Sequence, residues 1–135
     1  MTTENPRELP LSSQDDVVTV RQAVRARAIE VGLNLVEQTK VVTAASELAR
    51  NTVVYGGGGF VTIETVVDTG RRGVRLTFVD RGPGIPDIEL ALKDGYTSGT
   101  GLGLGLGGAR RLSSEFSIES KAGEGTRVTI VRWKG

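Results

Sequence analysis

Apolar residues recur at helical spacing through the first part of the chain. After Ser12 or Ser13, either of which can cap a helix, they continue at every third or fourth position as far as Gly32, a residue type suited to a helix end. A second helical stretch follows Asn34 and covers about residues 35–55. Its apolar residues spread over more than one face, so we expect this helix to be largely buried. The apolar positions are Val17, Val20, Val24, Ala28 and Val31 in the first stretch, and Val41, Val42, Ala45, Leu48, Ala49 and Val53 in the second.

The later part of the chain is rich in β-branched residues between glycine-containing turns, a pattern typical of strands. Two long helices followed by four strands predict an α+β fold, a two-layer α/β sandwich in which helices cover a mostly antiparallel sheet. The expected elements are a short first strand at 7–11, strands at 60–67, 74–80, 116–121 and 126–133, a short helix at 86–93, and a loop at 94–108 that runs into a helix ending near residue 115.

Length and composition indicate a single globular domain over residues 1–135, with 38% hydrophobic and 24% charged residues. No stretch approaches the ~18 apolar residues of a membrane-spanning helix. The N-terminus has no signal-peptide pattern, so we expect a cytoplasmic protein. Lys plus Arg number 17 and Asp plus Glu 16, a formal net charge of +1 that favours neither nucleic acid nor a membrane as partner.

Two absent residue types exclude several kinds of site. The chain has no cysteine, which excludes disulfides and thiolate metal sites. It also has no histidine, which excludes a Ser-His-Asp triad, histidine zinc ligands, a phospho-accepting histidine and the catalytic loop of eukaryotic-type protein kinases.

Glu47 and Asn51 are four residues apart on the second predicted helix, so they share one face. A carboxylate can deprotonate a hydroxyl nucleophile, and a carboxamide oxygen can bind Mg²⁺. Taken alone, the motif favours a simpler alternative, in which Glu47 pairs with Arg50 on a solvated face.

Asp80 ends a predicted strand and has the same parity as the apolar residues Leu76 and Phe78. A carboxylate buried there needs a hydrogen-bond donor, such as the exocyclic amine of adenine. Gly82 and Gly84 would allow a ring to lie against the backbone. The alternative, that Asp80 caps a turn made by the glycines, is equally compatible with this motif.

Two further glycine motifs follow. In residues 98–112 glycine alternates with leucine before a helix, which can present backbone N–H groups to phosphate. The G-x-G-x-x-G at Gly103 is weak evidence because no strand leads into it, and no Walker motif occurs. Residues 123–126 are explained by a hairpin turn, although Thr126 could add a hydroxyl to a phosphate site.

In this order the four motifs resemble those of the Bergerat-fold (GHKL) ATPases, such as gyrase, Hsp90, histidine kinases and MutL, over about residues 40–130. The chain lacks the histidine and dimerisation helices of a histidine kinase and the transducer domain of gyrase or MutL. The segments 45–51, 80–88 and 122–126 look like those of the small RsbT-type serine/threonine kinases of bacterial partner switching, and this likeness covers nearly the whole chain. The anti-sigma-factor kinases SpoIIAB and RsbW are more distant relatives.

The resemblance implies that Mg²⁺-ATP binds between the sheet and the helices. Glu47 would activate a serine or threonine hydroxyl of a protein substrate, Asn51 would hold the metal, and Asp80 would recognise the adenine. The further ATP-binding residues implied are Gly82, Gly84, Ile85, Thr100, Gly101, Leu102, Gly103, Gly105 and Thr126.

By the same resemblance the substrates are STAS-domain scaffold and antagonist proteins of the RsbS and RsbR type, and the output partner is a protein such as an RsbU-like phosphatase. The family also allows a homodimer. The alternative function is that of an ATP-binding anti-sigma factor that sequesters a sigma factor. We interpret Gly56–Gly59 as a connector and Arg50 as a brace for Glu47 rather than a phosphate contact.

Overall fold

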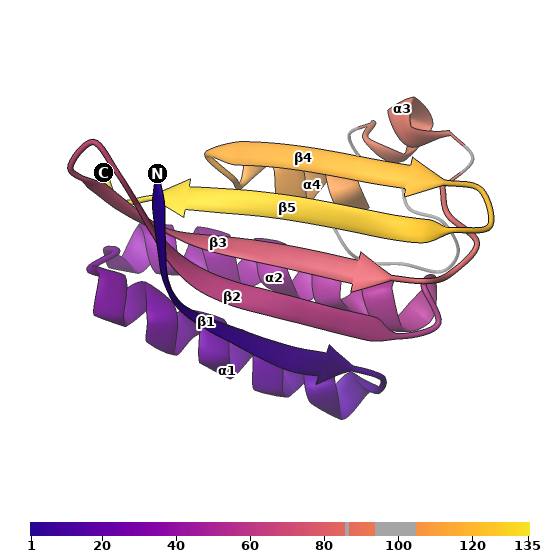
Figure 1. Cartoon of the computed structure of the whole chain (residues 1–135), viewed down its shortest axis with the longest axis horizontal. Coiled ribbons are helices and arrows are strands. Elements are labelled where there is room, and N and C mark those ends of the chain that lie inside the picture. Colours follow the sequence, from indigo (N-terminus) through magenta and orange to yellow (C-terminus); the bar gives the residue numbers. More distant parts are fainter. Residues whose placement is uncertain (86, 94–104) are drawn as a thin grey trace.

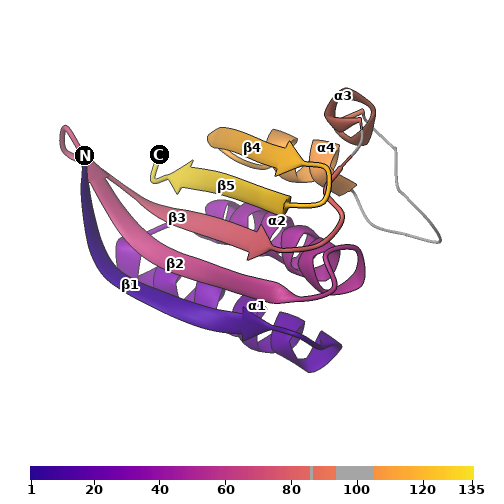
Figure 2. The ribbon, with the colours of Figure 1, turned by 45° about the vertical axis from the view of Figure 1, so that its right-hand side comes forward.

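A computed structural model describes residues 1–85, 87–93 and 105–135 of the chain. In this part of the chain, five antiparallel strands form one sheet in the order β1-β2-β3-β5-β4, and the long helices lie together against one face of it (Figures 1 and 2). The predicted two-layer α+β sandwich is therefore confirmed. The elements are β1 (Thr2–Leu11), α1 (Gln14–Val31), α2 (Leu35–Val54), β2 (Gly59–Asp68), β3 (Arg71–Asp80), α3 (Ile88–Ala91), α4 (Gly105–Arg111), β4 (Glu115–Lys121) and β5 (Gly125–Trp133).

Both long helices begin and end at the predicted residues. Ser13 precedes α1, and its backbone N–H donates to the Asp16 carboxylate at 3.2 Å. Gly32 ends α1 with a φ of 94°, the left-handed conformation for which a glycine was expected. Asn34 and Glu37 cap α2 reciprocally, each side-chain oxygen accepting the other residue's backbone N–H at 2.8 Å. Local sequence therefore places the α1–α2 hairpin.

The core lies between the helices and the sheet. The predicted apolar stripe of α1 is buried along its whole length, and α2 is buried against α1, α4 and the sheet. The sheet contributes the residues of alternate parity, including Leu76 and Phe78 of β3. Within the described residues, no helix combines the length and the apolar character needed to cross a membrane.

The first strand is longer than the predicted 7–11, because β1 begins at Thr2 and pairs with β2 almost throughout. An irregularity at Asn5, which has a φ of 49°, accommodates Pro6 and shifts the register. This segment has polar residues and a proline, so its strand character comes from backbone pairing and not from its side chains.

The helix after the glycine loop is shorter than predicted. It ends at Arg111 rather than near residue 115. The chain already joins the sheet at Ser114. Its backbone N–H donates to the Val131 carbonyl at 2.8 Å, and its hydroxyl accepts the backbone N–H of Trp133 at 3.0 Å. Pairing with β5 therefore stops α4 earlier than the helical pattern suggests.

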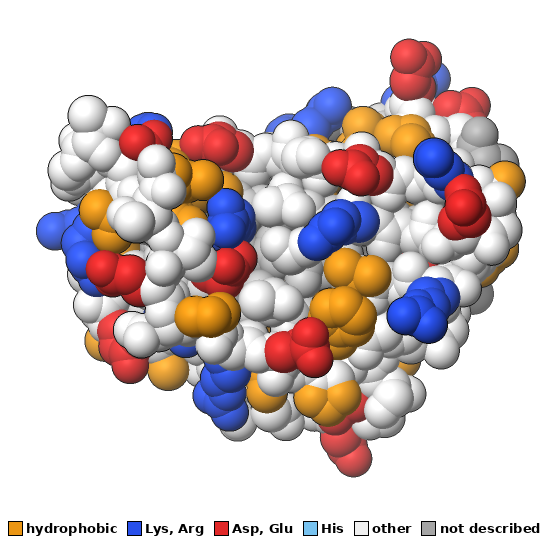
Figure 3. All heavy atoms as spheres, in the orientation of Figure 1, with side chains coloured by type: hydrophobic (Ala, Val, Ile, Leu, Met, Phe, Trp, Pro, Cys, Tyr) orange, Lys and Arg blue, Asp and Glu red, His pale blue; other side chains and the backbone are white. Residues whose placement is uncertain are grey.

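The opposite face of the sheet has a mixed character. Positive and negative side chains are interspersed over it (Figure 3). Val66, Val131 and Trp133 form a small separate cluster, and the Arg71 guanidinium lies 4.1 Å from the centre of the Trp133 ring. The Trp133 indole N–H donates to the Glu115 carboxylate at 2.6 Å. These polar contacts tie the Trp133 ring to β3 and β4.

Candidate active site

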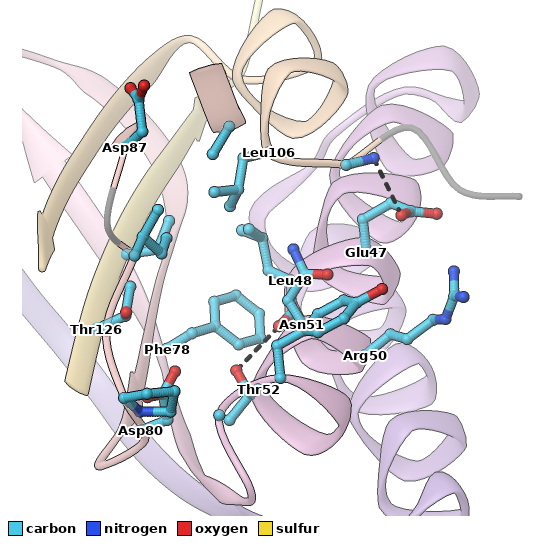
Figure 4. A pocket seen from close by; sticks show the side chains of 18 of the residues that line it. Glu47, Leu48, Arg50, Asn51, Thr52, Phe78, Asp80, Asp87, Leu106 and Thr126 are labelled. Atoms are coloured by element: carbon cyan, nitrogen blue, oxygen red, sulfur yellow. Dashed lines mark hydrogen bonds between the residues drawn. The ribbon is translucent and has the colours of Figure 1, made fainter. Parts of the chain in front are cut away.

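A cavity of about 390 Å³ opens between the C-terminal half of α2 and the adjacent ends of β3 and β5. This volume lies within the range typical of small-molecule sites. Phe78 and Val128 of the sheet, Leu48 of α2 and Leu106 of α4 provide apolar walls, which sequence analysis did not assign to the site (Figure 4). The other lining residues are Glu47, Arg50, Asn51, Thr52, Tyr55, Gly56, Asp80, Pro83, Gly84, Ile85, Asp87, Leu90, Ala91, Gly105 and Thr126.

Asn51 and Asp80 line the same cavity although they come from different layers. Asp80 follows Phe78 on the helix-facing side of β3, as its parity predicted, and Asn51 extends from α2 (Figure 4). The Asn51 carboxamide makes no hydrogen bond to any described residue. A carboxamide held open to a cavity can bind a ligand through its oxygen or its amide hydrogens.

The two oxygens of the Asp80 carboxylate have different surroundings. Its Oδ1 accepts the Gly82 backbone N–H at 2.9 Å, which is the turn-capping contact that the sequence allowed. Within the described part of the chain, Oδ2 has no hydrogen-bond donor. The two interpretations of Asp80 are therefore compatible, because one oxygen holds the turn and the other remains available in the cavity.

Glycines set the position of Asp80. A Cβ on Gly56 would overlap the Asp80 carboxylate, and a Cβ on Gly82 would come within 2.8 Å of the Gly56 Cα atom. Gly82 itself does not line the cavity, so its contribution is to the turn. Gly56 lines the cavity and is more than the connector that we expected. Its position just after a helix could not reveal this, because the contact with Asp80 spans the two layers.

Thr126 lies opposite Asp80 in the β3–β5 pairing, and both line the cavity. The Thr126 hydroxyl is 2.9 Å from the Ser120 hydroxyl, which also accepts the Ile85 backbone N–H at 2.8 Å. Gly84, with a φ of 80°, packs so closely on the Lys121 backbone that no side chain would fit. Ser120, which sequence analysis missed, thus joins the loop after β3 to the β4–β5 hairpin.

The predicted brace between Arg50 and Glu47 is wrong. Glu47 Oε2 instead accepts the backbone N–H of Gly105, at the start of α4, at 3.3 Å (Figure 4). Among the ion pairs of the described residues, none includes Arg50. Helical spacing places the two side chains on neighbouring positions but does not decide which partner each one meets.

Part of the predicted ATP site belongs to the segment 94–104, which the structure does not describe. Thr100, Gly101, Leu102 and Gly103 lie outside the described residues. Gly105 is described and lines the cavity at the first residue of α4. The structure thus brings together Glu47, Asn51, Asp80, Gly84, Ile85, Gly105 and Thr126, and it places Gly82 behind Asp80.

The fold is that of an ATPase domain. The sequence model of the histidine kinase-, DNA gyrase B- and HSP90-like ATPases matches residues 36–134, and the chain belongs to this family. Within the family it is a homologue of the serine/threonine-protein kinase RsbT of Bacillus subtilis (strain 168), with 47% identity over 118 residues, which are 87% of this chain and 89% of the relative. The resemblance noted from the motifs is confirmed.

Other relatives carry different names. An anti-sigma F factor of Clostridium acetobutylicum is 32% identical over 134 residues, 94% of this chain and 92% of the relative. The crystal structure of the RsbU and RsbW domains of Rv1364c from Mycobacterium tuberculosis matches 97% of this chain and 33% of that longer chain, with a TM-score of 0.65 and 24% identity. A mycobacterial sensor histidine kinase, MprB, matches 96% of both chains with a TM-score of 0.56 and 19% identity. The two structures support the fold.

Proposed function

We propose that the chain is an ATP-dependent protein serine/threonine kinase of a partner-switching pathway. The observation that carries this proposal is that Glu47, Asn51 and Asp80 line one cavity, with the Asn51 carboxamide and one Asp80 oxygen open to it. The 47% identity to the serine/threonine-protein kinase RsbT supports the same function.

Asp80 would recognise the base. Its free Oδ2 is an acceptor for an exocyclic amine, such as N6 of adenine, while Oδ1 stays bonded to Gly82. Phe78 and Val128 supply an apolar surface for the ring. Thr126, opposite Asp80 in the sheet, adds a hydroxyl at the same end of the cavity. This end of the site therefore suits a purine better than a simple phosphate.

Asn51 would hold Mg²⁺ together with the phosphates of ATP. The described residues contain no group of three carboxylate, histidine or cysteine side chains that could bind a metal by themselves. A single amide oxygen nevertheless fits Mg²⁺, which keeps several waters and usually binds through one or two protein ligands plus substrate phosphates. Bound there, the metal would neutralise phosphate charge.

Glu47 would act as the general base. It precedes Asn51 by one helical turn, and its carboxylate lies next to the first residue of α4. The carboxylate would accept the proton of a serine or threonine hydroxyl as that oxygen bonds to the γ-phosphorus and ADP leaves. The weak 3.3 Å contact with the Gly105 N–H keeps Glu47 at the cavity wall without occupying both of its oxygens.

The protein substrates that we propose are STAS-domain proteins of the RsbS and RsbR type, with an RsbU-like phosphatase as an output partner. Support comes from the RsbT homology and from the RsbU and RsbW domains of the M. tuberculosis structure. The similarity to an anti-sigma F factor supports a second candidate, an ATP-binding protein that sequesters a sigma factor.

One experiment separates these candidates. The purified chain is incubated with Mg²⁺, γ-labelled ATP and either an RsbS-type STAS protein or sigma factors from the same organism. Transfer of label to the STAS protein, but not to a variant whose acceptor serine or threonine is alanine, supports the kinase. Stable capture of a sigma factor without transfer supports the second candidate. If the chain neither transfers label nor captures a sigma factor, both candidate functions are wrong.

A further inference from the structure

Arg50 is a charged side chain of the cavity to which the proposed mechanism gives no role. It lies three residues after Glu47 and directly before Asn51, and it is half-buried. Among the described residues that line the cavity, it is the only lysine or arginine. Figure 4 shows Arg50 and Glu47 extending to the same outer side of α2, while Asp80 lies on the opposite side of the cavity.

In the described part of the chain, Arg50 has no acidic partner although three carboxylates line the same cavity. Glu47, Asp80 and Asp87 line the same cavity, yet in the described part of the chain each accepts a backbone N–H and none pairs with Arg50. On the other face of the sheet, by contrast, Arg75 forms a 3.0 Å ion pair with a glutamate. Within the described residues the Arg50 guanidinium therefore has no carboxylate partner, and it can bind an anion held on this outer side of α2, to which Glu47 also extends.

We propose that Arg50 contacts the γ-phosphoryl group during transfer and stabilises the charge on its oxygens; this inference rests on the proposed kinase function. In the reaction, the bond from the γ-phosphorus to the bridging oxygen breaks and its electrons leave with ADP. The acceptor hydroxyl oxygen bonds to phosphorus, and its proton goes to Glu47. Negative charge is spread over the phosphoryl oxygens throughout, and a guanidinium can donate to two of them at once.

The position of Arg50 distinguishes this role from nucleotide recognition in general. Asp80 marks the end of the cavity where the base would bind, and Arg50 lies across from it and extends to the same side of α2 as Glu47, the proposed general base (Figure 4). A cation at that place meets the phosphoryl group where donor and acceptor come together. We therefore expect Arg50 to contribute more to turnover than to ATP affinity.

The test compares Arg50→Gln, Arg50→Ala and Arg50→Lys with wild type, using an RsbS-type STAS protein as acceptor. Arg25→Ala is the matched control, because it removes an exposed arginine from α1, outside the cavity. Steady-state transfer gives kcat and KM for the acceptor, a titration gives the Kd for Mg²⁺-ATP, and thermal unfolding checks the fold. We expect Arg50→Ala and Arg50→Gln to lower kcat by about 10²–10³-fold, with the Kd for ATP changed by less than about fivefold.

Arg50→Lys should recover part of the lost turnover, because it keeps the charge but loses the two-pronged geometry. Three results would overturn the proposal. The first is kcat unchanged in Arg50→Gln. The second is a rise confined to the KM for the acceptor, which would make Arg50 a contact for the protein partner. The third comes from kcat measured as a function of pH: an acid limb that shifts while the maximal kcat stays unchanged would make Arg50 a positioning residue for Glu47.

These outcomes are separate from failure of the proposed function. If wild type transfers label and Arg50→Gln does so equally well, the kinase assignment stands and only the role of Arg50 fails. If wild type transfers no label to any acceptor, the kinase assignment itself fails, and with it this role for Arg50.

Discussion

Replacing Asp80 with asparagine tests the nucleotide site most directly, because the shape is kept and only the charge and one acceptor change. The side chain must serve two neighbours, the Gly82 N–H through Oδ1 and a ligand amine through Oδ2. Asparagine has one oxygen and one NH₂ group, so it can accept from only one of them. Whichever way the amide is oriented, one N–H donor faces another, and we expect Mg²⁺-ATP binding to be lost under ordinary assay conditions.

The magnitude follows from the hydrogen bonds at stake. A hydrogen bond to a charged group contributes about 1.5–3 kcal/mol, and an unsatisfied buried donor costs about 1–3 kcal/mol. A combined loss of about 3–5 kcal/mol weakens Kd by a factor on the order of 10²–10³ or more, since each 1.4 kcal/mol is tenfold. Isothermal titration of both proteins with Mg²⁺-ATP measures the change.

A matched substitution lies in the same cavity. Asp87 also lines it, but its carboxylate caps α3 by accepting the Leu90 N–H at 3.0 Å. Asp87→Asn makes the same chemical change at a residue with a local structural contact, and it should leave the Kd within about threefold, because an asparagine oxygen can still cap a helix. If Asp80→Asn binds Mg²⁺-ATP as tightly as Asp87→Asn does, Asp80 does not recognise the base and the orientation of ATP proposed above is wrong.

Three further predictions concern other parts of the molecule. Glu47→Ala should retain Mg²⁺-ATP affinity and lose phosphoryl transfer, which paired binding and label-transfer assays measure; unchanged turnover would remove Glu47 as the base. Gly56→Ala should weaken ATP binding by tenfold or more, because the new methyl group displaces the Asp80 carboxylate; an unchanged Kd would show that this contact is unimportant. Glu37 has a pKa held below its usual range, mainly by the Asn34 backbone N–H and further by that of Gly135, despite an opposing effect of burial. Its folded-state pKa is lower than its unfolded one, so its contribution to stability is complete above the unfolded pKa and is lost as pH falls through the folded pKa. Denaturant unfolding from pH 7 to pH 3 should therefore lose less stability in Glu37→Gln than in wild type, and equal losses would contradict this origin.

Much of the fold could be predicted because its signals are local. A helix places apolar residues on one face with a period of 3.6, and a strand does so with a period of 2. The sequence pattern therefore correctly predicted the buried face of α1 and the inward orientation of Leu76 and Phe78. The caps at Gly32 and Asn34 are equally local, since each satisfies backbone groups within one turn. The first strand was predicted too short because its first residues pair through the backbone, which the side-chain pattern does not report.

Sequence predicted several polar residues that the structure places around one cavity, but it predicted neither the apolar walls of that cavity nor the contacts between its residues. Spacing placed Glu47 and Asn51 on one helical face and parity placed Asp80 on the inner side of its strand. Periodicity cannot decide which side chains from separate elements meet, so the contact of Glu47 with Gly105 and that of Gly56 with the Asp80 carboxylate were missed.

Sequence alone thus determined the elements, their buried faces and the residue types available for chemistry, because these depend on interactions within a turn or between alternate residues. Tertiary structure decided that one oxygen of Asp80 remains open in the cavity that Asn51 also lines, and that Arg50 has no acidic partner in the described part of the chain. Both outcomes depend on how α2 packs over the sheet, because this packing brings together residues that are far apart in the chain. Local sequence patterns do not determine which of these residues come into contact.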